Sequence, residues 1–206
     1  MPGHDHAAIG YALDAGASIV IPQVGTVEEA QHVVSAAKFG SKHLGTRSAP
    51  PFRLLPGLTD TPINPELSTF ANTNNQAAII IQIETLEAIN NLDDILTQVK
   101  DIDAVWLGSL DCRVSMGLKG MHGEEPEWLE AVAKYKSVLA KHDMPDSGIA
   151  MGPPEVQAQA GKGKAFVVVA GDVIALLGHV GQLQDARNLF QPLKWRPTTN
   201  GEINYV

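Results

Sequence analysis

The sequence predicts an α/β protein whose sheet is parallel and built from five β-α units. Three observations support this prediction. Short apolar runs such as 77–81 and 104–107 are typical of strands buried on both faces. Amphipathic helical segments alternate with these runs, as in parallel sheets covered by helices. Acidic residues follow two of the strands directly, at the end where barrels and open α/β sheets carry their chemistry.

The first unit occupies the N-terminal forty residues. Residues 5–16 carry an apolar stripe that ends in a glycine, which predicts a short amphipathic helix. A strand is expected over 18–24. Thr26 and Glu29 have the spacing of a capping box, which predicts a helix that begins there and ends near Gly40.

The alternation of strand and helix continues along the chain. The predicted pairs are 77–83 with 85–98, 103–108 with 126–142, 147–151 with 153–160, and 165–170 with 172–189. Because these strands are apolar on both alternating faces, a barrel fits them better than a sandwich.

Two segments show no regular periodicity. The stretch 40–76 is rich in proline and too long for an ordinary connection, so we expect a functional or oligomer-contact loop. The tail 191–206 is expected to be disordered or docked on a neighbour. The predicted organisation is one partial barrel domain over 1–190 and a C-terminal tail over 191–206.

Composition excludes several classes of protein. The chain has 206 residues, 44% hydrophobic and 18% charged, which suits one domain with a sizeable core. Its net charge is −8 and its basic residues are scattered, so we expect no nucleic-acid partner. Neither a signal peptide nor a long apolar run is visible, so no membrane association is expected. Cys112 is the single cysteine, which favours a reducing compartment such as the cytoplasm.

Two carboxylates stand out as a possible metal site. Glu84 follows the apolar run 77–81, and Asp111 follows the run 104–107. The carboxyl ends of neighbouring parallel strands meet at one rim, where two carboxylates can bind a hard cation such as Mg²⁺. Glu84 could instead cap a helix or form a salt bridge.

Other polar residues have simpler explanations than chemistry. His4, Asp5 and His6 resemble a metal-binding tract, but residues near a terminus are more often solvated. Cys112 has no histidine placed by the sequence to activate it, so we do not expect a nucleophile.

Four segments together resemble the HpcH/HpaI aldolase/citrate lyase family. They read Ala-Leu-Asp-Ala-Gly-Ala at 12–17, Ile-Val-Ile-Pro-Gln-Val at 19–24, Gln-Ile-Glu-Thr-Leu-Glu-Ala at 82–88 and Asp-Ala-Val-Trp-Leu-Gly at 103–108. The proline-rich stretch followed by Asn-Thr-Asn-Asn at 72–75 is most similar to the fungal branch that includes macrophomate synthase.

The resemblance implies a (β/α)8 TIM barrel of the phosphoenolpyruvate/pyruvate type, and it implies roles for particular residues. Glu84 and Asp111 match the carboxylates that bind the divalent metal. Gln82 matches a residue lining the same mouth, and Arg47 matches a Gly-x-Arg segment; we take both as catalytic candidates. The segment Gly108, Ser109, Leu110, Asp111 matches the one that receives the substrate carboxylate.

The implied activity is that of a class II pyruvate aldolase. Such an enzyme cleaves or forms 2-oxo acid aldols through a metal-bound pyruvate enolate, with Mg²⁺, Mn²⁺ or Co²⁺ as cofactor. The implied partners are a 2-oxo acid such as pyruvate or oxaloacetate, an aldehyde and further copies of the chain. Two alternatives remain open: a biosynthetic oxaloacetate decarboxylase like macrophomate synthase, and a catalytically incompetent remnant or partner subunit.

The chain also departs from the family pattern. The family has three further strands before the first one here, with an Asp, a His and an Arg that have no counterpart. Where the family reads Arg-Val-Pro, this chain begins Met1-Pro2. We therefore expect an incomplete TIM barrel with five C-terminal β-α units, from a truncated gene model, an alternative start or a natural fragment. The family's Gly-Pro-x-Asp-Leu is altered at 108–112.

Overall fold

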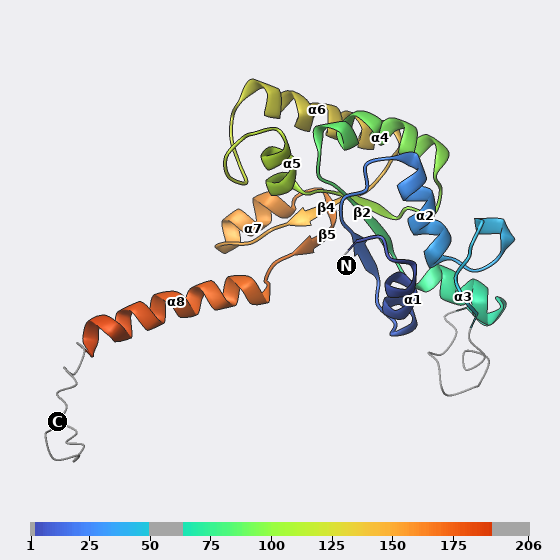
Figure 1. The fold of residues 1–206 in the computed structure, drawn as a ribbon, viewed down its shortest axis with the longest axis horizontal. Coiled ribbons are helices and arrows are strands. Elements are labelled where there is room, and N and C mark those ends of the chain that lie inside the picture. The colour runs from blue at the N-terminus through green and yellow to red at the C-terminus, as the bar shows by residue number, and fades with distance from the viewer. Residues whose placement is uncertain (1–2, 50–63, 191–206) are drawn as a thin grey trace, which may run out of the picture. The chain divides into compact units, whose positions relative to one another are not determined.

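The protein contains one sheet of five parallel strands, in agreement with the predicted incomplete barrel (Figure 1). The computed structural model describes residues 3–49 and 64–190. The strands are β1 (Ile19–Ile21), β2 (Ile79–Ile83), β3 (Ala104–Leu107), β4 (Asp146–Ile149) and β5 (Lys164–Val168), and they lie side by side in chain order. Adjacent strands in sequence order are what β-α units produce, because each helix returns the chain to the starting end of the sheet.

Helices connect the strands, and each predicted helix is present within about three residues of its expected bounds. They are α1 (His6–Asp14), α2 (Val27–Ala37), α4 (Leu86–Gln98), α6 (Pro126–Lys141), α7 (Pro154–Gly161) and α8 (Asp172–Leu189). The capping box predicted at Thr26 and Glu29 is formed at the start of α2. Thr85 caps α4 in a similar way, by accepting a bond from the N–H of Ala88.

Two helices were not expected from the sequence. The helix α3 (Thr69–Gln76) lies in the stretch predicted to be a loop, and α5 (Ser109–Ser115) lies between the predicted strand 103–108 and helix 126–142. A short 3-10 turn, Ser41–His43, lies in the same stretch as α3. The sequence of α3 is dominated by asparagine and threonine, which are weak helix formers. The short α5 has no side-chain cap at its start. Ser68 does cap α3, by accepting from the N–H of Ala71, so the local signal for α3 is its cap alone, and α5 has none.

The core lies between one face of the sheet and the helices α1, α2, α4 and α6 (Figure 1). Successive side chains of β2 point to opposite faces. Ile79, Ile81 and Ile83 are fully buried in this core. Gln82 and Glu84 alternate with these isoleucines, which places both of them on the opposite face. Core residues therefore occupy one face of β2 and candidate site residues the other.

The chain divides into two compact units. Among the described residues, the first contains 3–49, 64–148 and Gly161–Val167, and the second contains Ile149–Ala160 and 168–190. Within the second unit α8 has no buried residue. The predicted domain over 1–190 stays a prediction, and the tail 191–206 lies outside the described residues. Over the described ranges, no helix has both the length and the apolar character needed to cross a bilayer.

Candidate active site

Glu84 lies directly after β2 at the carboxyl end of the sheet, as predicted. Its side chain is only 5% exposed. The backbone N–H of Gln23, just after β1, donates to Glu84 Oε2 at 2.7 Å. The N–H of Gly108, just after β3, donates to the carbonyl of Ile83 at 2.9 Å. The ends of three neighbouring strands therefore meet at this carboxylate.

Gln23 adopts a backbone conformation that suits this contact. Its φ is 56°, in the left-handed region that non-glycine residues seldom occupy. The carbonyl of the preceding Pro22 is bonded to His4 Nε2 at 2.7 Å, so His4 has a structural partner rather than only solvent. The role of Gln23 could not be predicted from the sequence, because a backbone N–H gives no residue-specific signal. Strain of this kind is common at ligand sites.

Asp111 lies in the first turn of α5 rather than at the tip of β3, which corrects the expected local structure. The chain turns into a helix immediately after Gly108, and Cys112 N–H donates to the Gly108 carbonyl at 2.9 Å. Asp111 nevertheless lies close enough to Glu84 to affect its ionisation through both charge and a hydrogen bond. The predicted convergence of the two carboxylates is therefore present. Glu84 and Asp111 are called the carboxylate pair below.

Gly108 fits against the carboxylate of Glu84. A Cβ at position 108 would lie 2.5 Å from Glu84 Cγ, 2.6 Å from Oε1 and 2.9 Å from Cδ. Such distances are shorter than van der Waals contact, so any side chain here would displace the carboxylate. The backbone of Gly108 has an ordinary negative φ of −76°. Glycine is therefore required for space and not for its backbone freedom.

The electrostatics of the pair favour a cation. Burial is the largest cause that raises the pKa of Glu84; the bond from Gln23 opposes it, and neighbouring Asp111 adds to it. None of the ion pairs among the described residues involves either carboxylate. Two adjacent acidic groups without a cationic partner fit the chemistry of a divalent ion, which relieves their repulsion.

The donor set also limits which ion would fit. Within 3–49 and 64–190, no group of three or more His, Cys, Asp or Glu side chains is arranged to hold a metal. Zinc sites in proteins usually have three or four such ligands. Mg²⁺ is commonly held by one or two carboxylates and completes its shell with water and substrate oxygens. The carboxylate pair suits the second kind of ion.

The remaining predicted site residues are divided between two places. Gln82 lies two residues before Glu84 and pairs in register with Trp106 of β3. Ser109 and Leu110 form the start of α5, and Leu110 is exposed. The structure thus brings Gln82 and the segment 108–111 to the same rim as the carboxylate pair.

Arg47 lies elsewhere, near the carboxyl end of α2. Its guanidinium donates to Asp14 Oδ1 at 2.6 Å and to the carbonyl of Ala37 at 3.4 Å, and it lies 4.5 Å from the centre of the Phe39 ring. The opposite end of α2 begins beside Glu84, and 11 residues of helix span about 16 Å. Arg47 therefore joins α1 to the end of α2 and is not brought to the carboxylate pair.

Cys112 is next to Asp111 in sequence but points into the protein. Its side chain is fully buried. Burial, with the nearby charge of Glu84, raises the pKa of the Cys112 thiol to about 11. The thiol is therefore uncharged near neutral pH, in agreement with the expectation that Cys112 is no nucleophile.

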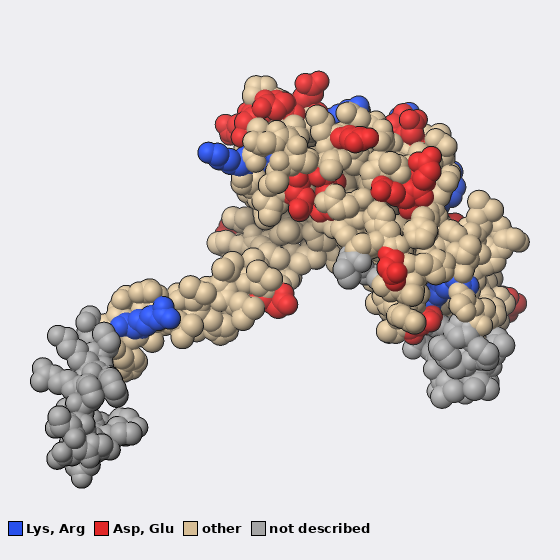
Figure 2. Space-filling view, in the orientation of Figure 1, with Lys and Arg blue, Asp and Glu red and all other residues tan. Residues whose placement is uncertain are grey.

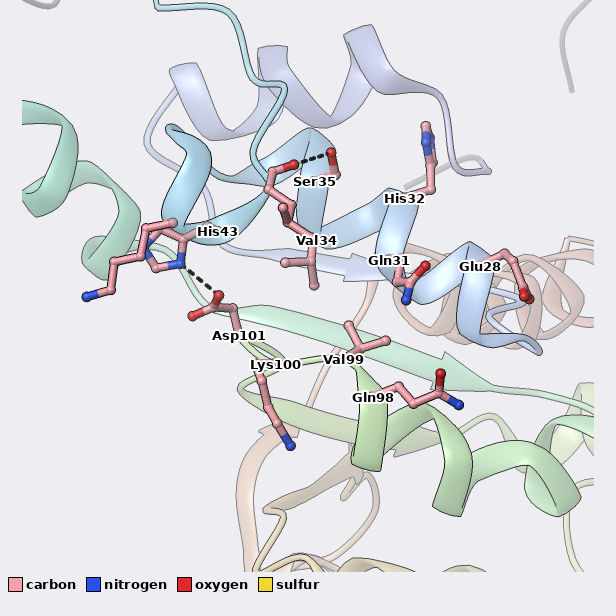
Figure 3. Close-up of a pocket in the computed structure, with 12 residues that line it drawn as sticks. Glu28, Gln31, His32, Val34, Ser35, His43, Gln98, Val99, Lys100 and Asp101 are labelled. Atoms are coloured by element: carbon pink, nitrogen blue, oxygen red, sulfur yellow. Dashed lines mark hydrogen bonds and ion pairs between the residues drawn. The ribbon is translucent and has the colours of Figure 1, made fainter.

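Two cavities differ in their relation to the carboxylate pair. One of about 200 Å³ lies beside Glu84, at the starts of α2 and α4, and Gln23, Thr26 and Glu87 also line it. Another of about 580 Å³ lies between α2 and α4 toward their carboxyl ends. In Figure 3, His43 and Asp101 point toward each other there, with Nδ1 and Oδ2 2.8 Å apart. No predicted site residue lines the larger cavity.

Acidic side chains are more conspicuous than basic ones on the visible face, most of which is neither (Figure 2). In Figure 2 acidic side chains spread over the region of α4 and α6, and basic side chains occur singly. No continuous basic strip appears on the described part of this face. The distribution agrees with the net charge of −8.

Comparison with known proteins finds a family match over most of the chain. The HpcH/HpaI aldolase/citrate lyase family matches residues 2–172. A 4-hydroxy-2-oxovalerate aldolase of Novosphingobium aromaticivorans is 35% identical over 156 residues, 69% of this chain and 55% of that protein. A 2-keto-3-deoxy-L-rhamnonate aldolase of Salmonella typhi is 30% identical over 172 residues, 82% of this chain and 60% of that protein. The chain thus spans a little more than half the length of these relatives.

Solved structures give the same fold. Macrophomate synthase is 29% identical with a TM-score of 0.74, over 93% of this chain and 67% of that one. An HpcH/HpaI aldolase of Desulfitobacterium hafniense has a TM-score of 0.73 at 24% identity, over 96% of this chain and 73% of that one. These matches confirm the resemblance inferred from the sequence and the partial barrel.

Proposed function

Because the chain belongs to the HpcH/HpaI aldolase/citrate lyase family, we propose that it is a divalent-metal-dependent carbon–carbon lyase of the class II pyruvate aldolase type. One observation carries the proposal. Glu84 is buried, its pKa is raised in part by the adjacent Asp111, and neither carboxylate forms an ion pair with a described basic residue.

Glu84 and Asp111 would hold the metal, with Mg²⁺ as the first choice and Mn²⁺ or Co²⁺ as substitutes. When bound, the cation would polarise the carboxylate and keto oxygens of a 2-oxo acid and so favour cleavage at the neighbouring carbon–carbon bond. The chain's own residues hold Glu84 in place. The N–H of Gln23 orients Glu84, and the absence of a side chain at Gly108 leaves room for it.

Substrate contacts are proposed for the same rim. The first N–H groups of a helix have no partner within the helix, so the backbone of Ser109, Leu110 and Asp111 can receive the substrate carboxylate. Gln82, on the same face of β2 as Glu84, is the proposed donor to a substrate oxygen at this mouth. For Arg47, which bonds Asp14 and the carbonyl of Ala37 at the other end of α2, we propose a role through the packing of α1 and α2.

The names of the relatives support the substrate class. Two of them are named for aldols of 2-oxo acids, which suggests a pyruvate-type acid and an aldehyde for this chain. The likeness to macrophomate synthase favours the alternative of a decarboxylating biosynthetic enzyme that uses the same metal-bound acid.

The cytoplasm is the proposed location, because a reducing compartment suits an enzyme with a single, unpaired cysteine.

Assembly into a homo-oligomer is supported by α8. Seven large apolar side chains on this helix are 51–77% exposed: Val173, Ile174, Leu176, Leu177, Val180, Leu183 and Leu189. A helix with this much apolar surface is normally covered. Further copies of the chain are the proposed cover, and light scattering during size-exclusion chromatography measures the assembly.

Exchange of the C3 protons of pyruvate with deuterated solvent tests the proposed function. NMR should show exchange that requires added Mg²⁺ or Mn²⁺ and stops with a chelator. Glu84→Gln and Asp111→Asn should each abolish it, because a carboxamide lacks the charge that a hard cation requires. Glu87→Gln, which changes a carboxylate lining the same small cavity, is the matched control. Exchange that continues unchanged in chelator rules out the metal mechanism. Absence of exchange even with added metal supports the alternative that the chain is catalytically incompetent.

A further inference from the structure

The helix α5 carries Asp111 but has little local support. It spans 7 residues, and its N-cap Gly108 provides no side chain to bind the free N–H groups of the first turn. Isolated helices of this length are unstable in water. Two of its side chains, Cys112 and Arg113, are buried. The position of α5 therefore depends on what these two residues contact.

Arg113 makes the stronger set of contacts. Its guanidinium donates to both carboxylate oxygens of Glu125, Nη1 to Oε2 and Nη2 to Oε1, each at 2.8 Å. Nη2 also donates to the carbonyl of Lys119 at 2.8 Å, and Nε donates to that of Gly120 at 3.0 Å. The guanidinium lies 5.3 Å from the centre of the Trp128 ring. A planar fork held in this way has little freedom to rotate.

The connection between α5 and α6 is built around this guanidinium. A Cβ at Gly123 would clash with both terminal nitrogens of Arg113. Gly117 has a φ of 75°, which lets the chain turn back after α5, and Leu118 N–H donates to the Arg113 carbonyl at 2.8 Å. Glu125 is the N-cap residue of α6. Arg113 thus ties α5 to a long helix of the core.

We infer that Arg113 is a positioning residue for the metal site, because its anchoring of α5 fixes the separation of the Asp111 and Glu84 carboxylates. Asp111 and Arg113 are two positions apart, which is a rotation of about 200° around the helix. The anchor therefore lies on the side of α5 away from the carboxylate pair and leaves Asp111 free to bind. This inference rests on the proposed function.

Affinity for Mn²⁺, measured on residues 1–206 by the EPR signal of free ion, tests the inference. Arg113→Lys keeps the charge but loses the planar fork, so it cannot bind both Glu125 oxygens and two carbonyls. The affinity of the folded variant should fall about 10–100-fold, as when a partner that orients a metal ligand is removed. Glu125→Gln keeps the shape of the partner but loses its charge, and should cause a smaller decrease.

Lys141→Met is the matched control, because it removes a basic side chain that pairs at 2.6 Å with Asp93 on the surface of α6 and α4. It should leave Mn²⁺ affinity unchanged. Far-UV circular dichroism and the Tm establish that each variant is folded. A merely structural role for Arg113 would lower the Tm without changing the affinity of the folded protein, and that result overturns the inference.

The outcomes also separate this inference from the proposed function. If the unmodified chain binds no Mn²⁺, the proposed function fails and the inference fails with it. If the unmodified chain binds Mn²⁺ and folded Arg113→Lys binds it equally well, only the inference fails. Should Arg113→Lys not fold, Glu125→Gln decides: unchanged affinity overturns the inference, and reduced affinity supports it.

Discussion

In the metal-free protein, the negative charge of Glu84 destabilises the folded state, because the carboxylate is buried and lies near Asp111. Its pKa is raised above its ordinary value of 4.5, first by burial and further by Asp111. The folded chain then keeps a proton on this group at pH values where the unfolded chain has lost it. Stability without metal therefore decreases as pH rises above the ordinary value, and the decrease is complete once pH has passed the raised pKa.

Replacement of Glu84 by Gln should remove this pH-dependent loss of stability. In chelator at pH 7.5, we expect Glu84→Gln to have a higher Tm than the unmodified chain, with the difference disappearing below about pH 4. Saturating Mg²⁺ should reverse the order, since an ion at 100 times its Kd stabilises the folded state by about 2.7 kcal/mol. Differential scanning calorimetry across pH measures both effects. A variant that is less stable than the unmodified chain in chelator would contradict the electrostatic account.

Gly108 provides a purely steric test. Gly108→Ala places a methyl group within 2.5–2.9 Å of three Glu84 side-chain atoms. The carboxylate must move, and we expect Mn²⁺ affinity to fall about 10-fold or more, as for other changes that reorient a metal ligand. Gly10→Ala is the control, because a Cβ there meets nothing within 4 Å. Equal affinities in the two variants would show that the position of Glu84 does not matter for binding.

The thiol of Cys112 should be unreactive in the folded protein. Its thiol is fully buried and its pKa is about 11, so little thiolate is present near neutral pH. We expect an aromatic disulfide reagent at pH 7.5 to label no cysteine until denaturant unfolds the first unit. Rapid stoichiometric labelling of the native chain would show that α5 opens readily and would weaken the case for a fixed Asp111.

At the scale of helices and strands, the N-terminus of α2 contributes to the stability of the fold and also lines the cavity beside Glu84. Thr26 accepts from Glu29 N–H at 3.2 Å and lines the small cavity beside Glu84. Thr26→Ala should lower the free energy of unfolding by about 1 kcal/mol and the Tm by about 2–4 °C. Thr97→Ala changes the same residue type inside α4, where no cap is lost, and should be nearly neutral. Urea unfolding of both variants provides the comparison, and equal losses would contradict the capping role.

The same elements show why most of the fold could be predicted from the sequence. The capping box at Thr26, the apolar runs in the strands and the glycine after α1 are local signals, and each was found where expected. The helix α5 has no side-chain cap, and α3 consists mainly of weak helix formers although Ser68 caps it, so both depend on tertiary contacts. Asn74, for example, holds α3 by accepting from Phe39 N–H at 2.8 Å and donating to its carbonyl at 2.9 Å. Contacts between distant segments have no counterpart in sequence periodicity.

At the scale of the whole molecule, the site was only partly predictable. Glu84 and Asp111 could be identified because acidic residues after buried strands are conspicuous. The N–H of Gln23 and the guanidinium of Arg113 could not, because their roles depend on a left-handed backbone and on a partner twelve residues away. Arg47 shows the opposite case: it matches a family segment, but its contacts lie at the other end of α2.

The central claim is that one divalent cation binds between Glu84 and Asp111, and Mn²⁺ binding followed by EPR tests it most directly. The unmodified chain should bind one Mn²⁺ per molecule, competitively with Mg²⁺. Glu84→Gln and Asp111→Asn should each lose this site, while Glu87→Gln should keep it. Absence of stoichiometric binding to the folded chain, or an equal loss in Glu87→Gln, would contradict the claim.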